Sequence, residues 1–217
     1  MADAARPLFI GIAGIIGAGK SSLTRDLAAA IPGAVALYEP VDNPYLEAFY
    51  RDRARYAFEF QVFMLQRRFE QHREAAVLSK SRTVVQDRTL WEDTVFAQMM
   101  HDAGYISDQG WQTYLALFRS LEEYMVRPDA IFYLDVEPDL ALERVRQRDR
   151  GAEQGLELEY LVRLRDTYEQ WIAGTHDLLN IVRVSWRSFC PATEFLPLIA
   201  RATTRPGGIA ARWGRHL

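Results

Sequence analysis

The chain has 217 residues, of which 49% are hydrophobic, so it can bury the core of one α/β domain with a lid but hardly that of a second full domain. Its 26 Lys and Arg stand against 29 Asp and Glu, and the net charge of −3 offers no global field for nucleic acid or an anionic membrane as a partner. A single cysteine, no leader-like start and no apolar stretch of about 18 to 20 residues predict a soluble cytoplasmic protein.

Short apolar runs alternate with long amphipathic segments along the chain. The runs predicted as strands are Leu8–Ala13, Ala34–Tyr38, Thr83–Gln86, Ala130–Asp135 and Ile181–Ser185. The segments predicted as helices, from the spacing of their apolar residues, are Ser22–Ala30, Tyr56–Ser79, Asp108–Val126 and Leu156–Ala173. This alternation is typical of βαβ units and predicts an α/β fold with a mostly parallel sheet.

The last residues differ in composition from the rest of the chain. Residues 201–217 contain Arg201, Arg205, Arg212 and Arg215 but no acidic residue. We therefore expect a single domain over residues 1–200, followed by a basic C-terminal tail. Such a tail is either a frayed chain end or a flap that contacts a phosphate.

A glycine-rich loop follows the first predicted strand. The segment from Gly14 to Ser21 reads G-I-I-G-A-G-K-S and matches the phosphate-binding pattern G-x-x-x-x-G-K-[ST]. Backbone N–H groups in such a loop surround phosphate oxygens, Lys20 reaches the β- and γ-phosphates, and Ser21 can ligate Mg²⁺. A plain strand-to-helix turn would need neither the lysine nor the hydroxyl. The residues expected to bind the nucleotide are Gly14, Gly17, Ala18, Gly19, Lys20, Ser21 and Ser22.

Two further strand ends carry acidic residues. Asp87 and Arg88 follow the third predicted strand, where open α/β sheets bind ligands, so Asp87 can hold Mg²⁺ and Arg88 can bind the reacting oxygen or a phosphate. The alternative is a salt-bridged turn. Glu39 follows the second strand and is a candidate general base, although an exposed loop glutamate is an equal reading.

Several arginines end the helix that is expected after Asp135. Arg144, Arg146, Arg148 and Arg150 lie within seven residues, and Arg144 and Arg148 are one helical turn apart. Arginines that close over a transferred phosphoryl group stabilise its charge and exclude water. We therefore expect a lid over about residues 144–155, with a solvated helix face as the alternative.

In order and spacing, these motifs resemble those of the deoxynucleoside kinase family over about residues 8–175. The resemblance includes Glu39-Pro40-Val41, Asn43-Pro44-Tyr45-Leu46, Phe58-Glu59-Phe60-Gln61, Asp87-Arg88-Thr89 and Glu153-Gln154-Gly155 with Leu158-Glu159-Tyr160-Leu161. It implies a P-loop kinase with a five-stranded parallel sheet of order 2-3-1-4-5, ATP and Mg²⁺ as cofactors, and a homodimer. It departs from many members in Ala13 and Ile15 of the loop and in D-R-T for E-R-S.

The resemblance also implies roles for individual residues. Glu39 takes the proton of the substrate 5′-hydroxyl and Arg88 positions that oxygen. Gln61 pairs with the base, Arg68 and Asp93 complete base recognition, and Tyr50 and Glu153 bind the 3′-hydroxyl. Arg144, Arg148 and Arg150 match the lid arginines. Because Gln61 and Arg68 are seven residues apart, both should project from one helix face into one pocket. Phe58, Phe60, Phe63 and Trp91 could stack on a base or belong to the core.

The expected activity is transfer of the γ-phosphate of ATP to the 5′-hydroxyl of a deoxynucleoside, deoxyadenosine or deoxyguanosine above others. The nearest alternative is a nucleoside-monophosphate kinase of the thymidylate type, whose anionic acceptor would need an arginine near position 39 instead of a base. A nucleotide-dependent regulator is a third class. The D-x-x-G and N-K-x-D motifs of GTPases do not occur in the sequence.

Overall fold

A computed structural model describes residues 6–40, 42–148, 155–175 and 177–204. Its centre is a five-stranded sheet in the order β2-β3-β1-β4-β5. The strands are β1 (Phe9–Ala13), β2 (Val35–Leu37), β3 (Val84–Asp87), β4 (Ala130–Asp135) and β5 (Ile181–Ser185). Every pairing is parallel, with Ile10 of β1 opposite both Val85 of β3 and Ala130 of β4. The five predicted strands and their implied order are confirmed.

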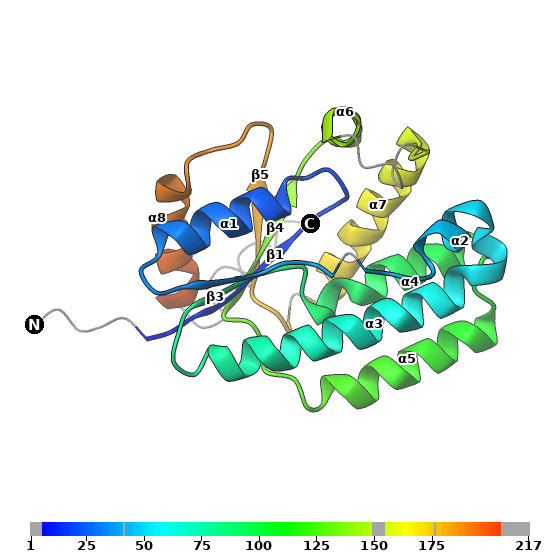
Figure 1. Ribbon diagram of the computed structural model, residues 1–217, viewed down its shortest axis with the longest axis horizontal. Coiled ribbons are helices and arrows are strands. Elements are labelled where there is room, and N and C mark those ends of the chain that lie inside the picture. The colour runs from blue at the N-terminus through cyan, green and yellow to red at the C-terminus, as the bar shows by residue number, and fades with distance from the viewer. Residues whose placement is uncertain (1–5, 41, 149–154, 176, 205–217) are drawn as a thin grey trace, which may run out of the picture.

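Helices cover both faces of the sheet (Figure 1). On one face lie α1 (Lys20–Ala30) and α8 (Ala192–Thr204), which contact each other. The other face carries α3 (Arg53–Leu78), α4 (Asp93–Asp102), α5 (Asp108–Glu122) and α7 (Leu158–Thr175). Three shorter or more peripheral elements complete the fold: α2 (Leu46–Arg51), the 3-10 turn η1 (Leu90–Glu92) and α6 (Pro138–Arg148). The arrangement is a three-layer α/β sandwich.

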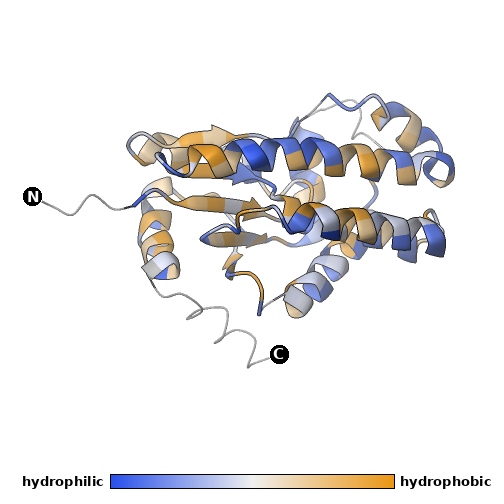
Figure 2. Cartoon of the chain, turned by 90° about the horizontal axis from the view of Figure 1, so that it is seen from below, coloured by the Kyte–Doolittle hydropathy of each residue, from blue (hydrophilic) through white to orange (hydrophobic). Residues whose placement is uncertain are grey.

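The core lies between the sheet and its two helical layers. The strands are mostly hydrophobic in Figure 2, and all five residues of β1 are buried. This continuous apolar pattern is expected of a parallel strand that is covered on both faces. Among the described helices, none is long and apolar enough to cross a membrane.

Two of the helices begin at a side-chain cap. Helix α3 begins at Arg53, three residues before the predicted start, because the Asp52 side chain accepts a hydrogen bond from the Arg55 N–H at 3.1 Å. The Ser107 hydroxyl caps α5 in the same way, at 3.1 Å from the Gly110 N–H. Three helices, α2, α4 and α8, were not predicted. Two of them are short and adjoin another element, since α2 ends at Arg51 just before α3 and α4 starts directly after η1.

Helix α8 includes residues 201–204, which were predicted to belong to the basic tail. The reason is packing, because Ala202 is 1% exposed within the main core. The remaining residues of the predicted tail lie outside the described residues.

Candidate active site

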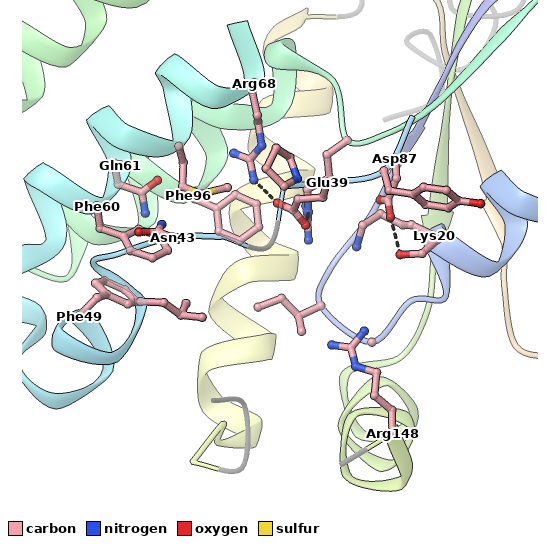
Figure 3. Close-up of a pocket in the computed structure, with 18 of the residues that line it drawn as sticks. Lys20, Glu39, Asn43, Phe49, Phe60, Gln61, Arg68, Asp87, Phe96 and Arg148 are labelled. Carbon is pink, nitrogen blue, oxygen red and sulfur yellow. Dashed lines mark hydrogen bonds and ion pairs between the residues drawn. The ribbon is translucent and has the colours of Figure 1, made fainter. Parts of the chain in front are cut away.

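A cavity of about 810 Å³ lies at the carboxyl edge of the sheet (Figure 3). The P-loop, the segment after β2, α3, the end of β3, α4 and α7 all contribute to its wall. Of the residues predicted from the sequence, the cavity is lined by Gly17, Lys20, Ser21, Ser22, Glu39, Tyr50, Gln61, Arg68, Asp87, Arg88 and Arg148. Parallel strands thus bring together side chains that are far apart in the chain.

The P-loop forms one end of the cavity. Gly17 and Gly19 have φ values of 83° and 93°, a backbone conformation that residues with a side chain rarely adopt. A Cβ atom on Gly17 would also lie 2.2 Å from the Ala141 carbonyl oxygen of α6, so the loop can pack there only without one. Helix α1 starts at Lys20, which directs its N-terminal N–H groups toward this end.

Lys20 is nearly fully buried at the same end, with its Nζ donating to the Ile15 carbonyl at 2.9 Å. Burial, with a smaller contribution from the nearby Arg88, lowers the pKa of this ammonium to about 8. The amine is therefore cationic at neutral pH but close to its titration range.

The Ser21 hydroxyl and the Asp87 carboxylate lie together beside the P-loop. Ser21 Oγ donates to Asp87 Oδ2, and Asp87 Oδ1 is buried without a hydrogen-bond partner among the described residues. Burial raises the pKa of Asp87. One carboxylate and one hydroxyl suit Mg²⁺, which takes most of its remaining ligands from phosphates and water, so the residues present fit this ion. Groups of three or more His, Cys, Asp or Glu that could hold a metal do not occur in the described part of the chain.

Glu39 lies between the P-loop end and the opposite end of the cavity (Figure 3). Its carboxylate accepts hydrogen bonds from Arg88 Nε at 3.0 Å and from an Nη of Arg68. Burial by itself would raise the pKa of Glu39, but Arg88, Arg68 and Lys20 outweigh it and lower the pKa to about 2. The side chain is 30% exposed, so an ionised carboxylate faces the cavity at neutral pH.

Gln61 and the aromatic residues form the opposite end (Figure 3). As predicted from their spacing, Gln61 and Arg68 project from one face of α3, and both are buried against the cavity. Gln61 Oε1 has no hydrogen-bond partner among the described residues, so the amide can serve a ligand. Phe60 lines the cavity and stacks on Phe49 at 4.3 Å between ring centroids. This end offers a polar edge and flat apolar walls.

The other aromatic residues considered for base stacking take different places. Phe63 packs on Tyr45 at 5.9 Å, and Trp91 is 5% exposed against Phe118. Phe58 packs against the core without lining the cavity. Of the four, only Phe60 contributes to the wall.

Asp93, predicted to touch the substrate, does not line the cavity. It is fully buried, and its two carboxylate oxygens accept hydrogen bonds from Arg68 and from the Tyr114 hydroxyl of α5. The carboxylate is thus occupied by protein groups and acts on the cavity through Arg68. The sequence did not indicate a role for Tyr114, because no local pattern links it to Asp93, 21 residues earlier.

The predicted lid arginines do not all face the cavity. Arg148 lines the cavity, whereas Arg144 points away from it: its guanidinium donates to the carbonyls of Ala18, Trp186 and Arg187 and lies 4.7 Å from the Phe189 ring. The cause is the segment after β5, which covers Arg144 and which helical spacing could not reveal. Arg146 is exposed. Arg150 and Glu153 lie outside the described residues, as does Val41.

Other lining residues had no predicted role. They are Ile16, Arg25, Tyr38, Pro40, Asn43, Leu46, Phe49, Met64, Phe96 and Tyr160. Pro40, Asn43, Leu46 and Tyr160 stand within motifs already noted in the sequence, and this was the signal that could have identified them. For Phe96 and Met64 the sequence offered no signal of a role in the cavity, because an apolar residue on a helix is explained equally well by core packing.

The chain matches one protein family and several known proteins. A family model described as deoxynucleoside kinase matches residues 10–191. Over 190 residues the chain is 36% identical to a deoxyadenosine kinase of Dictyostelium discoideum, covering 88% of this chain and 77% of the relative. It is 36% identical over 168 residues to a deoxyadenosine/deoxycytidine kinase of Bacillus subtilis (strain 168), covering 76% of each.

A solved structure is similar as well. It is that of deoxyadenosine kinase from M. mycoides with bound dATP, with a TM-score of 0.77 at 26% identity, covering 91% of this chain and 100% of the other. The similarity therefore extends over nearly the whole fold that forms the cavity.

Proposed function

Since the chain belongs to the deoxynucleoside kinase family, it is an ATP-dependent kinase of deoxynucleosides, and we propose that it transfers the γ-phosphate to the 5′-hydroxyl with Glu39 as the general base. One observation supports the assignment: the Glu39 carboxylate lies between the phosphate-binding loop and the end of the cavity that is lined by Gln61 and Phe60. In-line transfer needs an acceptor oxygen at this point.

We propose the following division of roles. The donor phosphates bind at the P-loop, where Lys20 contacts the β- and γ-phosphates. Ser21 and Asp87 hold Mg²⁺, which neutralises phosphate charge when bound. Arg148 approaches the phosphoryl group from the lid side, because the pocket wall includes its side chain. These positions would place cationic groups around the equatorial oxygens of the transferred group.

At the acceptor end, Gln61 and Arg68 would bind the base edge, and Phe60 and Phe96 would pack on its faces. Tyr50 is the candidate for the sugar 3′-hydroxyl. A purine is the proposed base, which agrees with relatives named deoxyadenosine kinase and deoxyguanosine kinase. The deoxyadenosine/deoxycytidine kinase among the relatives makes deoxycytidine the second acceptor to test.

The basicity of Glu39 has to change during turnover. With a pKa of about 2 it is ionised but weakly basic while Arg88 and Arg68 both bind it. A substrate hydroxyl that hydrogen-bonds to Glu39, and a base that draws Arg68 away, would raise its proton affinity. We propose that acceptor binding thereby makes the carboxylate competent.

A nucleoside-monophosphate kinase is the rival reading. None of the relatives described above is such an enzyme. Position 39 holds a glutamate, whereas an anionic acceptor would favour an arginine there.

The variant Glu39→Gln tests the base assignment. General-base catalysis contributes about 10²- to 10⁴-fold, so kcat should fall by that order while the acceptor still binds. The matched control is Glu70→Gln, an exposed glutamate of α3 paired with Arg67, which should keep wild-type turnover. Turnover within about threefold of wild type in Glu39→Gln would remove Glu39 from the mechanism.

We also propose that the protein is a homodimer and that it acts in the cytoplasm. The α3 and α5 helices expose the apolar residues Val77 and Leu117, although such residues also occur singly on monomers. Sedimentation equilibrium would decide between one and two copies of the 24.9 kDa chain.

A further inference from the structure

Arg88 has an unusual backbone conformation. Its φ of 63° is the only positive value of a residue other than glycine among the described residues. A side chain disfavours this region, so the conformation persists where the surroundings impose it. The Arg88 N–H is fixed by the Ile12 carbonyl of β1 at 3.0 Å, directly behind the P-loop. The strained backbone thus directs the guanidinium into the site.

The guanidinium is held on two sides. Nε donates to Glu39 at 3.0 Å, while Nη1 donates to the Tyr168 hydroxyl at 2.7 Å and to Glu92 Oε2 at 3.3 Å. The Arg88 Cζ atom lies 4.6 Å from the centre of the Phe96 ring. Nη2 has no partner among the described residues, so this is the nitrogen that remains for the reacting oxygens.

Glu92 and Tyr168 do not line the cavity and are both fully buried. Glu92 Oε1 accepts the Thr89 N–H at 3.0 Å, and its other oxygen accepts the Tyr168 hydroxyl as well as Arg88. Each side-chain oxygen of Glu92 and Tyr168 therefore has a hydrogen-bond partner. Burying a carboxylate is costly, and such networks are often no more stabilising than apolar packing of the same volume. Their contribution is the geometry that they impose.

We infer that Glu92 and Tyr168 are positioning residues that clamp Nη1 of Arg88, so that Nη2 is presented to the 5′-oxygen of the acceptor beside Glu39. The inference goes one step beyond the proposed function and rests on it. Tyr168 belongs to α7, the helix that also supplies Tyr160 to the cavity wall, so the clamp ties Arg88 to a second element of the site. Glu92 and Glu39 thus both pair with the Arg88 guanidinium.

Tyr168→Phe tests the clamp, because it removes one hydroxyl and keeps the ring. The matched control is Tyr133→Phe, a buried tyrosine of β4 whose ring lies 5.3 Å from that of Tyr168 and whose hydroxyl makes no hydrogen bond with the described residues. We expect kcat of Tyr168→Phe to fall by about 10-fold or more, the usual effect of losing a hydrogen bond to a charged group, with the acceptor KM within about twofold of wild type.

A double-mutant cycle with Arg88→Lys separates positioning from a general loss of structure. If Tyr168 acts through Arg88, Tyr168→Phe in the Arg88→Lys background should change kcat by less than about twofold. If the reductions in kcat caused by Tyr168→Phe and Arg88→Lys multiply in the double variant, the two residues act independently and the inference is overturned. If Tyr168→Phe does not fold, as judged by thermal unfolding, Glu92→Gln keeps the side-chain size and is judged by the same criteria.

Failure of the proposed function and failure of the clamp give different results. A wild-type chain that phosphorylates no nucleoside overturns the proposed function and the clamp with it. An active wild type whose Tyr168→Phe variant behaves like Tyr133→Phe overturns the clamp alone.

Discussion

Lys20 should make nucleotide binding sensitive to pH in the mildly alkaline range. Its ammonium is buried and has a pKa of about 8 in the free protein, and only the cationic form can neutralise donor phosphates. With that pKa, the protonated fraction is about 0.9 at pH 7 and about 0.1 at pH 9. We therefore expect kcat/KM for ATP to fall by about tenfold between these two pH values.

We expect a different pH profile for kcat. Bound phosphates favour the charged amine and raise its pKa, so kcat at saturating ATP should stay flat through pH 9. Steady-state kinetics from pH 6.5 to 9.5 with ATP varied would measure both profiles. The control is Lys20→Arg, which lowers activity but keeps its charge over this range, so the alkaline decline should vanish. A decline of equal size in Lys20→Arg would refute the assignment to Lys20.

Two other predictions concern residues outside the cavity. His72 is buried with its Nε2 donating to the Val126 carbonyl, and burial lowers its pKa to about 4. Because the folded-state pKa lies below the unfolded value of about 6.5, its neutral form is accommodated at pH 7, and stability is lost as the pH falls toward 4. Between pH 7 and 5 the loss is about 2 kcal/mol, and urea unfolding of His72→Gln should lack it; an equal pH dependence in the variant would contradict this. Tyr114→Phe removes the hydroxyl that holds Asp93, so the KM for the nucleoside should rise by about 10-fold while that for ATP is unchanged, with the exposed Tyr124→Phe as control. A wild-type nucleoside KM in Tyr114→Phe would show that Asp93 needs no such support.

Local patterns predicted the scaffold well because the strands are continuous apolar runs. The bounds of β4 and β5 match the predicted ones, and α3 differs at its start by three residues only because Asp52 caps it. The order of the strands came from the family resemblance, since periodicity alone does not say which strands pair. Helix α4 escaped prediction because its apolar residues continue those of η1 without a break in pattern.

Within the site, the sequence predicted the residues whose placement follows from a motif or from helical spacing. Lys20, Ser21 and Asp87 meet as expected, and Gln61 and Arg68 share one face. What could not be predicted depends on contacts between distant segments. Arg144 is hydrogen-bonded to carbonyls after β5 and does not line the cavity, and Asp93 is buried with its carboxylate hydrogen-bonded to Tyr114. The Tyr168 hydroxyl reaches Arg88 from 80 residues away, and nothing in the sequence around either residue indicates the pairing.

We propose that a nucleoside hydroxyl, and not a nucleotide phosphate, receives the phosphoryl group. An acceptor panel with Mg·ATP tests it most directly, comparing deoxyadenosine, deoxyguanosine, deoxycytidine and thymidine with their 5′-monophosphates by product formation. We expect that one or more nucleosides become 5′-monophosphates, a purine nucleoside fastest, while the monophosphates stay unreacted. Phosphorylation of a monophosphate alone would contradict it, because the carboxylate of Glu39 would then face an acceptor that needs no base.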